Sequence, residues 1–417
     1  MPRVRRRAVL PATAAVLGLV LTACGSRVGE DGAGAAPAES CVDTSGDSIK
    51  VGAINSLSGA TAINETVIRD AIEFAVDEIN ADGGVLGKQL DLIAEDGASD
   101  PTVFAEKAEK LVTSDCVAAV FGGYTSASRK AMLPVFEDNG GLLYYGQQYE
   151  GLEDSSNIFY SGATTNQQII PALDYLKEQG VTSLYLVGSD YVFPRTSNAI
   201  VKAYADANGI EIKGEDYLPL GATEFSTIVN KIRTADADAV FNVVVGDSLV
   251  AFFREFTAAG LTAADMPVMS MCLGEEEVAA VGVENVRDHL ASWNYYQTLE
   301  TPENTSFVEA FRAEYGADRV TSDPMESAYT GVHLWKAMVE KADSFDVADV
   351  QEAADGVSYD SPGGTVVVDG DNHHISKTAR IGQIRADGQI VSVWESDGAI
   401  EPDPYLTTYD WAEGLAD

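Results

Sequence analysis

Short apolar runs alternate with amphipathic segments along most of the chain, beginning with the run IKVGAI. Over residues 63–80, the apolar residues Val67, Ala71, Phe74 and Ile79 recur at the spacing of one helix face, and two glycines follow. This pattern predicts an amphipathic helix after a buried strand. The same alternation returns several times, and repeated β–α units are typical of a parallel sheet with helices on both faces.

The predicted strands are too numerous for one ordinary sheet, so we expect two lobes. After the last of them come two long helical patterns, over residues 301–316 and 324–341, and then a strand–turn–strand pattern with Asp387 and Gly388 at the hairpin. This mixture predicts that the chain crosses between the lobes more than once. The first group of strands lies near 49–55, 89–95, 117–122 and 141–145, and the second lies near 183, 212, 240, 267 and 290.

The chain begins with four arginines and a short apolar run over residues 1–23, which is typical of a secretory signal. The run ends in Leu-Thr-Ala-Cys, a string that resembles the lipobox of bacterial lipoproteins. We therefore expect export and anchoring by a lipidated Cys24 to the outer face of the cytoplasmic membrane. Residues 24–48 are mostly small and polar and predict a flexible tether. The alternative is an ordinary signal peptide with a chance cysteine.

The chain is strongly acidic, with 27 Lys and Arg against 65 Asp and Glu and a formal net charge of -38. Removing residues 1–23, which hold four arginines and no acid, changes this charge from -38 to -42. Such a surface repels nucleic acid and anionic lipid headgroups. We therefore expect no nucleic-acid partner and no membrane contact beyond the lipid anchor.

Three cysteines remain besides Cys24. Cys41 precedes the folded part, and Cys116 opens the apolar run VAAVF. Because an exported protein can keep a disulfide, we predict a bond between Cys41 and Cys116, with Cys272 as a free, buried thiol. No CxxC motif or Cys/His cluster suggests a metal site, so no metal or other cofactor is expected.

Ligands of open parallel sheets bind at the carboxyl ends of the strands, so the segments that follow the predicted strands are the candidate site. These segments are rich in hydroxyl, amide, carboxylate and tyrosine side chains and poor in bases. They are NSLSGATA (55–62), EDGASDP (95–101), GGYTSAS (122–128), GQQYEGLE (146–153), GSDYVFPR (188–195), VGDS (245–248) and CLGEEE (272–277).

The glycine-rich segment 122–128 raises the question of what it holds. A phosphate site combines backbone N–H groups with Lys or Arg, but the nearby Arg129 already belongs to the following helix. A flat neutral molecule fits the composition better, since tyrosine faces can enclose it and hydroxyls can donate to its carbonyl. The alternative is helix capping, which Ser126 could provide but which does not explain Tyr124 or Tyr191.

No segment has the pattern of a catalytic site. The four histidines lie outside the strand-end segments, and no GxSxG motif accompanies them. The adjacent pair His373–His374 could bind a metal, but we expect it to pack or to face solvent. We therefore expect a binding protein and not an enzyme. The four histidines are His289, His333, His373 and His374.

Longer strings extend these motifs, among them LSGATAINET, EDGASD, FGGYTSASRKAMLPVFE, QYEGLEDSSNIFYSG, GSDYVFPRTSN, WNYYQTLETPEN and DNHH. Together they resemble the substrate-binding proteins of urea and short-chain amide ABC importers, in the type I periplasmic-binding family that includes the leucine/isoleucine/valine-binding proteins. The resemblance runs from about residue 49 to residue 405. It implies an α/β fold with two Rossmann-like lobes, a central cleft and three hinge crossovers. The implied ranges are 49–162 plus 296–355 for the N-terminal lobe, 163–295 plus 356–397 for the C-terminal lobe, and 398–417 for a tail.

The resemblance and the composition together imply that side chains from both lobes contact the solute. Tyr124, Tyr191 and Phe193 would enclose it, Ser126 would donate to its carbonyl, Gln148, Glu150 and Asp247 would accept from its N–H groups, and Tyr145 and Gln147 fall in the same cleft loop as Gln148. An amino acid would instead need an acid for its ammonium group, which Glu150, Asp247 or Glu275 could supply.

We therefore expect a lipid-anchored, extracytoplasmic protein that binds urea or a short amide by lobe closure, without chemistry. It would deliver the solute to the permease subunits of an ABC importer. The alternatives are binding of a branched-chain or other amino acid, and a ligand sensor of the same fold, against which the signal and Cys24 argue. An exported amidohydrolase lacks any supporting motif.

Overall fold

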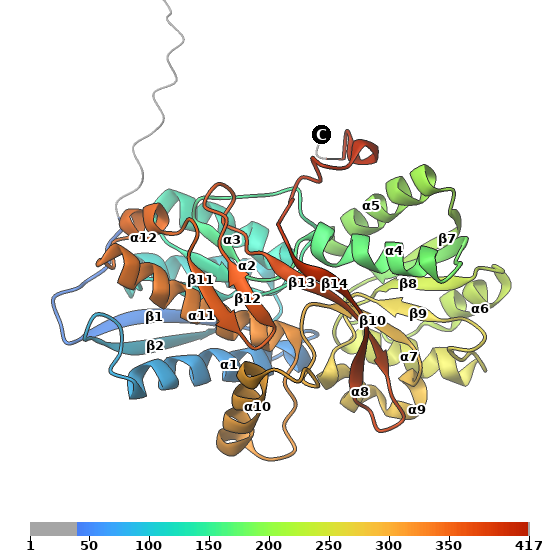
Figure 1. The fold of residues 1–417 in the computed structure, drawn as a ribbon, viewed down its shortest axis with the longest axis horizontal. Coiled ribbons are helices and arrows are strands. Elements are labelled where there is room, and N and C mark those ends of the chain that lie inside the picture. The colour runs from blue at the N-terminus through green and yellow to red at the C-terminus, as the bar shows by residue number, and fades with distance from the viewer. Residues whose placement is uncertain (1–39, 416–417) are drawn as a thin grey trace, which may run out of the picture. The chain divides into compact units, whose positions relative to one another are not determined.

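The computed structural model describes residues 40–415, and the predicted signal, the lipidation site Cys24 and most of the predicted tether lie outside the described residues. The first lobe is built on a parallel sheet with the strand order β2-β1-β3-β4-β5. Its strands β1 and β2 lie side by side in Figure 1. This order confirms the predicted β–α alternation and adds β5 to the predicted strands. The strands are β1 (Ser48–Asn55), β2 (Gln89–Asp96), β3 (Val120–Gly122), β4 (Leu143–Tyr145) and β5 (Ile158–Tyr160).

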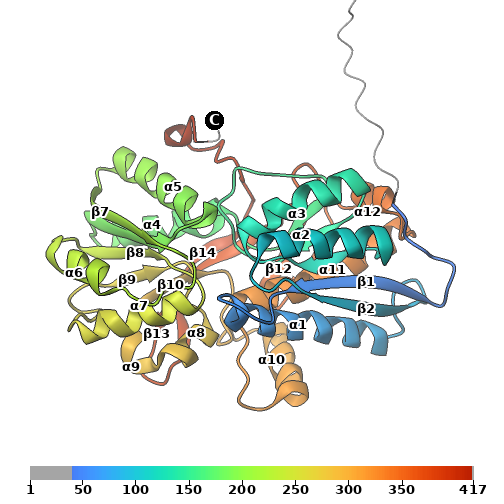
Figure 2. The same ribbon diagram turned by 180° about the vertical axis from the view of Figure 1, so that it is seen from behind.

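Helices cover both faces of the first sheet, because its residues alternate between two apolar clusters. Phe121 and Tyr144 belong to the cluster under α1 and α11, whereas Val120 and Leu143 belong to the cluster under α2 and α3. The two layers are visible in Figures 1 and 2. The helices are α1 (Ala62–Ala81), α2 (Pro101–Glu109) with a π-helical turn (Lys110–Ser114), α3 (Ser126–Asn139), α10 (Pro302–Tyr315), α11 (Asp323–Ala342) and α12 (Val347–Ala353).

The second lobe has a sheet in the order β14-β13-β10-β9-β8-β6-β7, in which β13 and β14 are antiparallel additions to five parallel strands. The predicted hairpin at Asp387 joins these two added strands. The strands are β6 (Ser183–Ser189), β7 (Glu211–Leu218), β8 (Ala239–Val243), β9 (Val268–Ser270), β10 (Leu290–Trp293), β13 (Lys377–Ile384) and β14 (Ile390–Ile400). The helices are α4 (Ile169–Glu178), α5 (Val192–Asn208), α6 (Ser226–Thr234), α7 (Asp247–Ala258), α8 (Glu275–Val281) and α9 (Val283–Val286).

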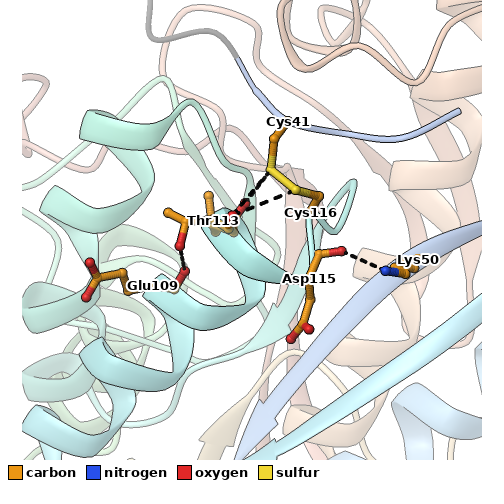
Figure 3. Close-up of a disulfide and its surroundings, with 7 residues drawn as sticks. Cys41, Lys50, Glu109, Thr113, Asp115 and Cys116 are labelled. Atoms are coloured by element: carbon orange, nitrogen blue, oxygen red, sulfur yellow. Dashed lines mark hydrogen bonds between the residues drawn. A yellow bond between two sulfur atoms is a disulfide. The ribbon is translucent and has the colours of Figure 1, made fainter.

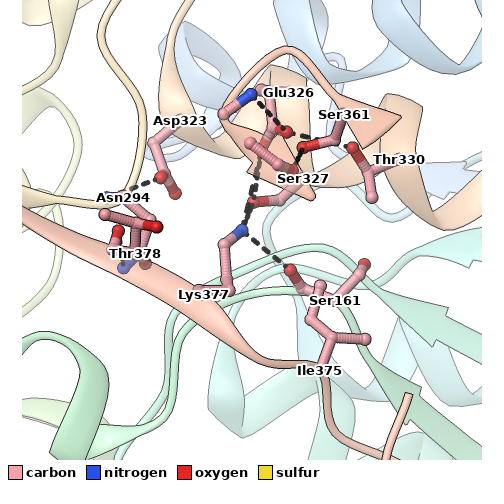
Figure 4. Close-up of polar contacts among 12 residues, drawn as sticks. Ser161, Asn294, Asp323, Glu326, Ser327, Thr330, Ser361, Ile375, Lys377 and Thr378 are labelled. Atoms are coloured by element: carbon pink, nitrogen blue, oxygen red, sulfur yellow. Dashed lines mark hydrogen bonds and ion pairs between the residues drawn. The ribbon is translucent and has the colours of Figure 1, made fainter. Parts of the chain in front are cut away.

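The chain crosses between the lobes after β5, after β10 and before β13, as the resemblance implies. The side chain of Lys377, at the third crossover, is buried where these segments meet (Figure 4). Its Nζ donates to the carbonyl oxygen of Ser161 at 3.0 Å and to Ser327 Oγ at 2.6 Å, and it lies 3.6 Å from Glu326 Oε2. One ammonium group therefore contacts the first crossover and helix α11 together.

Asn294 completes this junction from the second crossover (Figure 4). Its Nδ2 donates to the carbonyl oxygen of Thr378 at 3.0 Å and to that of Gln167 at 3.1 Å. Its backbone N–H donates to Asp323 Oδ2 at 2.9 Å. All three crossovers are thus joined by hydrogen bonds between buried side chains and backbone.

The chain enters the second lobe for the last time later than the implied boundary at residue 355. The strands β11 (Ser358–Ser361) and β12 (Gly364–Val367) form a separate antiparallel pair, and β11 packs beside α11. Val366 belongs to the apolar cluster of the first lobe. The third crossover therefore follows β12, and β14 runs past residue 397 to Ile400.

Cys41 and Cys116 form a disulfide with a Cα–Cα distance of 5.2 Å, as the sequence predicts (Figure 3). The bond joins the start of the described chain to the turn that precedes β3, across a sequence separation of 75 residues. Lys50 of β1 donates to the carbonyl oxygen of Asp115 beside it, at 3.3 Å. Cys272 is free and buried, also as predicted.

Replacing Cys41 and Cys116 together by serine should lower the free energy of unfolding by about 2–4 kcal/mol, because the bond restricts the unfolded chain. Denaturant unfolding of the oxidised native protein and of the double variant measures the difference. Reductant should destabilise the native protein by a similar amount and leave the variant unchanged. Equal stability of the native protein with and without reductant would contradict this account.

Candidate functional site

Each sheet has a switch point, where the chain leaves two neighbouring parallel strands in opposite directions. In the order β2-β1-β3 the switch lies between β1 and β3, and in the order β8-β6-β7 it lies between β6 and β8. Ligands of such sheets bind outside the carboxyl ends of the strands at this point. Tyr124 and Ser126 follow β3, and Tyr191 and Phe193 follow β6, so the sequence placed these residues correctly along the fold.

Aromatic rings from the two lobes meet at these strand ends. Tyr124 is buried and, although it belongs to the first lobe, it packs into the apolar cluster of the second lobe with Phe193. The ring centroids of Tyr191 and Phe193 lie 6.4 Å apart. Burial raises the pKa of the Tyr124 phenol well above its usual value, and the nearby Tyr191 and Glu277 raise it further. The phenol is therefore neutral at physiological pH.

Arg129 lies near the start of α3, and its side chain is fully buried. Its Nε donates to Glu153 Oε1 at 2.6 Å and its Nη2 donates to Glu150 Oε1 at 3.1 Å. The guanidinium carbon lies 4.9 Å from the ring centroid of Tyr145 and 4.5 Å from that of Tyr149. The partners of this arginine thus belong to the loop after β4 and not to its own helix.

The ion pairs determine the charge of this loop. Burial would raise the pKa of Glu153, but the Arg129 guanidinium outweighs this effect and lowers the pKa to about 2. Lys130 also pairs with Glu153. Glu153 is therefore ionised at any pH at which the protein works, and Arg129 remains charged.

Four polar atoms at the end of β4 and in the loop that follows it are buried and lack a hydrogen-bond partner among the described residues. They are two donors, the hydroxyl of Tyr145 and Nε2 of Gln147, and two acceptors, Oε1 of Gln148 and Oε2 of Glu150. Buried polar atoms are nearly always paired in native proteins, so four unpaired atoms within residues 145–150 require an explanation. A small polar solute that both accepts and donates would pair them.

Gln148 also reaches the second lobe. Its Nε2 donates to the carbonyl oxygen of Met271 at 3.3 Å and contacts Cys272 Sγ at 3.6 Å. Burial raises the pKa of the Cys272 thiol, and the nearby Glu277 raises it further, so the thiol stays protonated. The loop after β4 therefore lies against the segment that follows β9.

Ser126 is buried in the first turn of α3, and its Oγ accepts from Arg129 Nη1 at 3.1 Å. Two other predicted residues lie apart from this cluster. Asp247 begins α7 with an exposed side chain, and its backbone N–H donates to the carbonyl oxygen of Ala60 at 3.2 Å. Glu275 is buried beside the second crossover, where its Oε1 accepts from the backbone N–H of Gln297 at 2.9 Å.

Buried carboxyl groups form a second polar contact between the lobes. Asn64 of α1 donates through Nδ2 to Glu277 Oε1 of α8, and Ser322 donates through Oγ to Glu276 Oε1. Burial raises the pKa of both glutamates. The sequence singled out Glu275 in this run, but the structure brings Glu277 to Tyr124 and to the opposite lobe.

The adjacent histidines are packed against aromatic rings. His373 stacks on Phe159 and His374 stacks on Tyr160, each with a centroid distance of 4.2 Å. Burial lowers the pKa of His374 to about 3, so this ring is neutral. The pair thus supports the loop that carries Arg129's partners, as the packing interpretation of the sequence expected.

The C-terminal segment, residues 401–415, contacts both lobes. The carbonyl oxygen of Pro404 accepts from the backbone N–H of Leu152 at 2.8 Å, and Tyr405 donates to Asp154. In the second lobe, the ring of Trp411 meets Tyr204 of α5 edge-on at 5.6 Å. This segment therefore holds the loop of the first lobe that contains Glu150 and Glu153.

A groove of about 560 Å³ lies elsewhere on the first lobe, lined by residues that include Glu78, Tyr329, His333 and Tyr359. It lies at the C-terminal end of α1, which in a β–α unit faces the amino ends of the strands. The groove contains none of the predicted ligand residues. The unpaired atoms at the carboxyl ends therefore identify a different place from the groove.

The profile of the periplasmic binding protein domain family matches residues 49–410. The chain belongs to this family. Among curated relatives, Leu/Ile/Val-binding protein homolog 6 of Brucella suis biovar 1 (strain 1330) is 26% identical over 347 residues, covering 81% of this chain and 88% of that protein. This periplasmic binding protein is thus similar to a Leu/Ile/Val-binding protein homolog over most of the length of both chains.

Solved structures share the fold of this periplasmic binding protein. The solute-binding protein of an ABC transporter from Rhodopseudomonas palustris HaA2, in complex with p-hydroxybenzoic acid, gives a TM-score of 0.79 at 23% identity and covers 87% of this chain and 100% of that chain. LivJ from Streptococcus pneumoniae, in complex with isoleucine, gives 0.73 at 23% identity and covers 85% and 100%. The same fold thus holds different solutes. Within residues 40–415, no helix is both long and apolar enough to cross a membrane.

The stability of this binding protein should depend on pH through Glu65, which anchors the segment after β1. Its carboxylate accepts from Ser56 N at 2.7 Å and from Thr61 Oγ1 at 2.6 Å, yet burial raises its pKa from 4.5 to about 8. Between these values the folded state binds more protons than the unfolded state, so stability falls as pH rises from about 4.5 to about 8. Glu65→Gln, which mimics the protonated form, should remove this contribution.

Denaturant unfolding of the native protein and of Glu65→Gln between pH 5 and pH 8 measures the effect. The variant should gain stability relative to the native protein as pH rises, on the order of a few kcal/mol. The exposed Glu303→Gln is the matched control and should give a constant difference. If the stability difference between Glu65→Gln and the native protein were also constant with pH, burial would not raise the pKa of Glu65.

Proposed function

We propose that this protein captures a small neutral solute, urea or a short-chain amide, between its lobes and delivers it to the permease subunits of an ABC importer. The four unpaired polar atoms on Tyr145, Gln147, Gln148 and Glu150 carry the proposal. Their two donors and two acceptors match a molecule whose carbonyl and N–H groups lie side by side. Anchoring by a lipidated Cys24 to the outer face of the cytoplasmic membrane is part of the same proposal.

The surroundings of these atoms support a flat, uncharged ligand. Tyr124, Tyr191 and Phe193 present aromatic rings from both lobes, and such rings can enclose a planar amide. Urea has four heavy atoms, and at roughly -1.5 kcal/mol per atom its binding free energy reaches at most about -6 kcal/mol, or tens of micromolar. In this proposal the two lobes close on the solute and leave it chemically unchanged.

A second candidate is a branched-chain or other amino acid, which the name of the Brucella relative and the isoleucine complex of LivJ favour. One observation in this chain supports it, because the buried Glu277 lies near Tyr124 and could meet an ammonium group. The site is less suited to a carboxylate, since Arg129 is already paired with Glu150 and Glu153.

Calorimetric titration of the purified protein with urea, acetamide, formamide, leucine and 4-hydroxybenzoate tests the proposal. Saturable binding of urea or an amide, with no binding of leucine, is the expected result. Binding of leucine alone would show that the solute is an amino acid and not an amide. Release of ammonia from urea by the protein alone would overturn the proposal in favour of an amidohydrolase.

Tyr145→Phe should weaken binding of urea or acetamide by about tenfold, because it removes one unpaired donor of the site while keeping the ring. Tyr144→Phe is the matched control, since the Tyr144 hydroxyl contacts Met338 Sδ on the opposite face of the same strand. Isothermal titration of both variants measures the change. Equal affinities for Tyr145→Phe and Tyr144→Phe would remove Tyr145 from the site.

A further inference from the structure

The guanidinium of Arg129 contacts three side chains of the candidate site at once. Its Nε donates to Glu153 Oε1 at 2.6 Å, its Nη1 donates to Ser126 Oγ at 3.1 Å and its Nη2 donates to Glu150 Oε1 at 3.1 Å. The side chain has no solvent exposure. A buried cation with three specific partners fixes the positions of all of them.

The bond from Arg129 determines the direction of the Ser126 hydroxyl. A serine hydroxyl has one proton to donate and two lone pairs that accept, and Arg129 Nη1 occupies one lone pair. The proton must therefore point away from Arg129. The neutral Tyr145 phenol is its neighbour and brings a second proton, so at least one of these two O–H groups is left to donate outside the pair.

Arg129 acts in the opposite sense on Glu150. It occupies Oε1 of this carboxylate and leaves Oε2 without a partner. The site thus keeps one acceptor from Glu150 next to the donors from Ser126 and Tyr145. The position of the Arg129 side chain therefore determines which atoms of Ser126 and Glu150 remain available to a solute.

The charges around Arg129 also cancel. The two cations, Arg129 and Lys130, pair with the two carboxylates of Glu150 and Glu153. No cation of this cluster is left to neutralise a buried carboxylate of a solute, and burying an unpaired charge is costly. A zwitterion or an aromatic acid would therefore bind less well here than an uncharged molecule.

We infer that Arg129 is a positioning and specificity-determining residue, which orients the Ser126 hydroxyl toward a solute oxygen, presents Glu150 Oε2 to a solute N–H and restricts the site to uncharged solutes. This inference rests on the proposed function. Arg129 itself does not need to touch the solute. Its effect on affinity passes through Ser126 and Glu150.

The test combines a charge-balanced variant with a double-mutant cycle. Arg129→Met alone leaves two acids buried beside one lysine and risks misfolding, so Arg129→Met with Glu153→Gln is the working variant. Its titration with urea and acetamide should show an affinity at least about tenfold below that of the native protein. Arg319→Met is the matched control, because Arg319 pairs with Asp70 at 2.6 Å and lies 5.4 Å from the ring centroid of Phe311.

Ser126→Ala distinguishes positioning from a merely structural role. In the native background it should weaken urea binding about tenfold, whereas in the Arg129→Met/Glu153→Gln background it should have almost no further effect. The inference would be overturned if Ser126→Ala weakened urea binding equally in both backgrounds. It would also be overturned if the Arg129→Met/Glu153→Gln variant bound urea with native affinity. Binding of leucine but not of urea by the native protein would overturn the proposed function first, and with it the restriction to uncharged solutes.

Discussion

The two lobes depend on one buried ammonium group. Lys377 lies where the crossovers of the chain meet, and its Nζ is satisfied by a backbone oxygen of Ser161, by the hydroxyl of Ser327 and by the nearby carboxylate of Glu326. A buried charge is tolerated only when it is paired, so these segments must stay together for the charge to remain buried. The junction therefore holds the first crossover, the third crossover and α11 together at one place.

Most of the fold could be predicted from the sequence because β–α units repeat locally. The first-lobe helices α1 and α11 begin and end within a residue or so of their predicted ranges, and the hairpin at Asp387 is present. The short strand β5 was missed, since three residues without a helix of their own give little periodic signal. The pair β11–β12 was assigned to the wrong side of the cleft, because its packing against α11 is a long-range property.

The candidate site shows the same division between local and long-range information. The positions of Tyr124 and Tyr191 follow from strand ends, which a sequence reveals. The partners of Arg129 do not, since Glu153 lies 24 residues further along the chain, beyond β4. The role of Asp247 stays a prediction. The first residue of a helix can face either a cleft or the solvent, and the side chain of Asp247 at the start of α7 is exposed.

The segment of residues 401–415 affects a loop that lies far from it in the sequence. Pro404 and Tyr405 hold the loop between Leu152 and Asp154, and Trp411 is fixed on the other lobe. Loss of residues 401–415 would therefore loosen the loop that carries Glu150 and Glu153 without changing any residue in it. Tyr405 lies 251 residues after its partner Asp154, so a change in one segment acts on another that is close only in space.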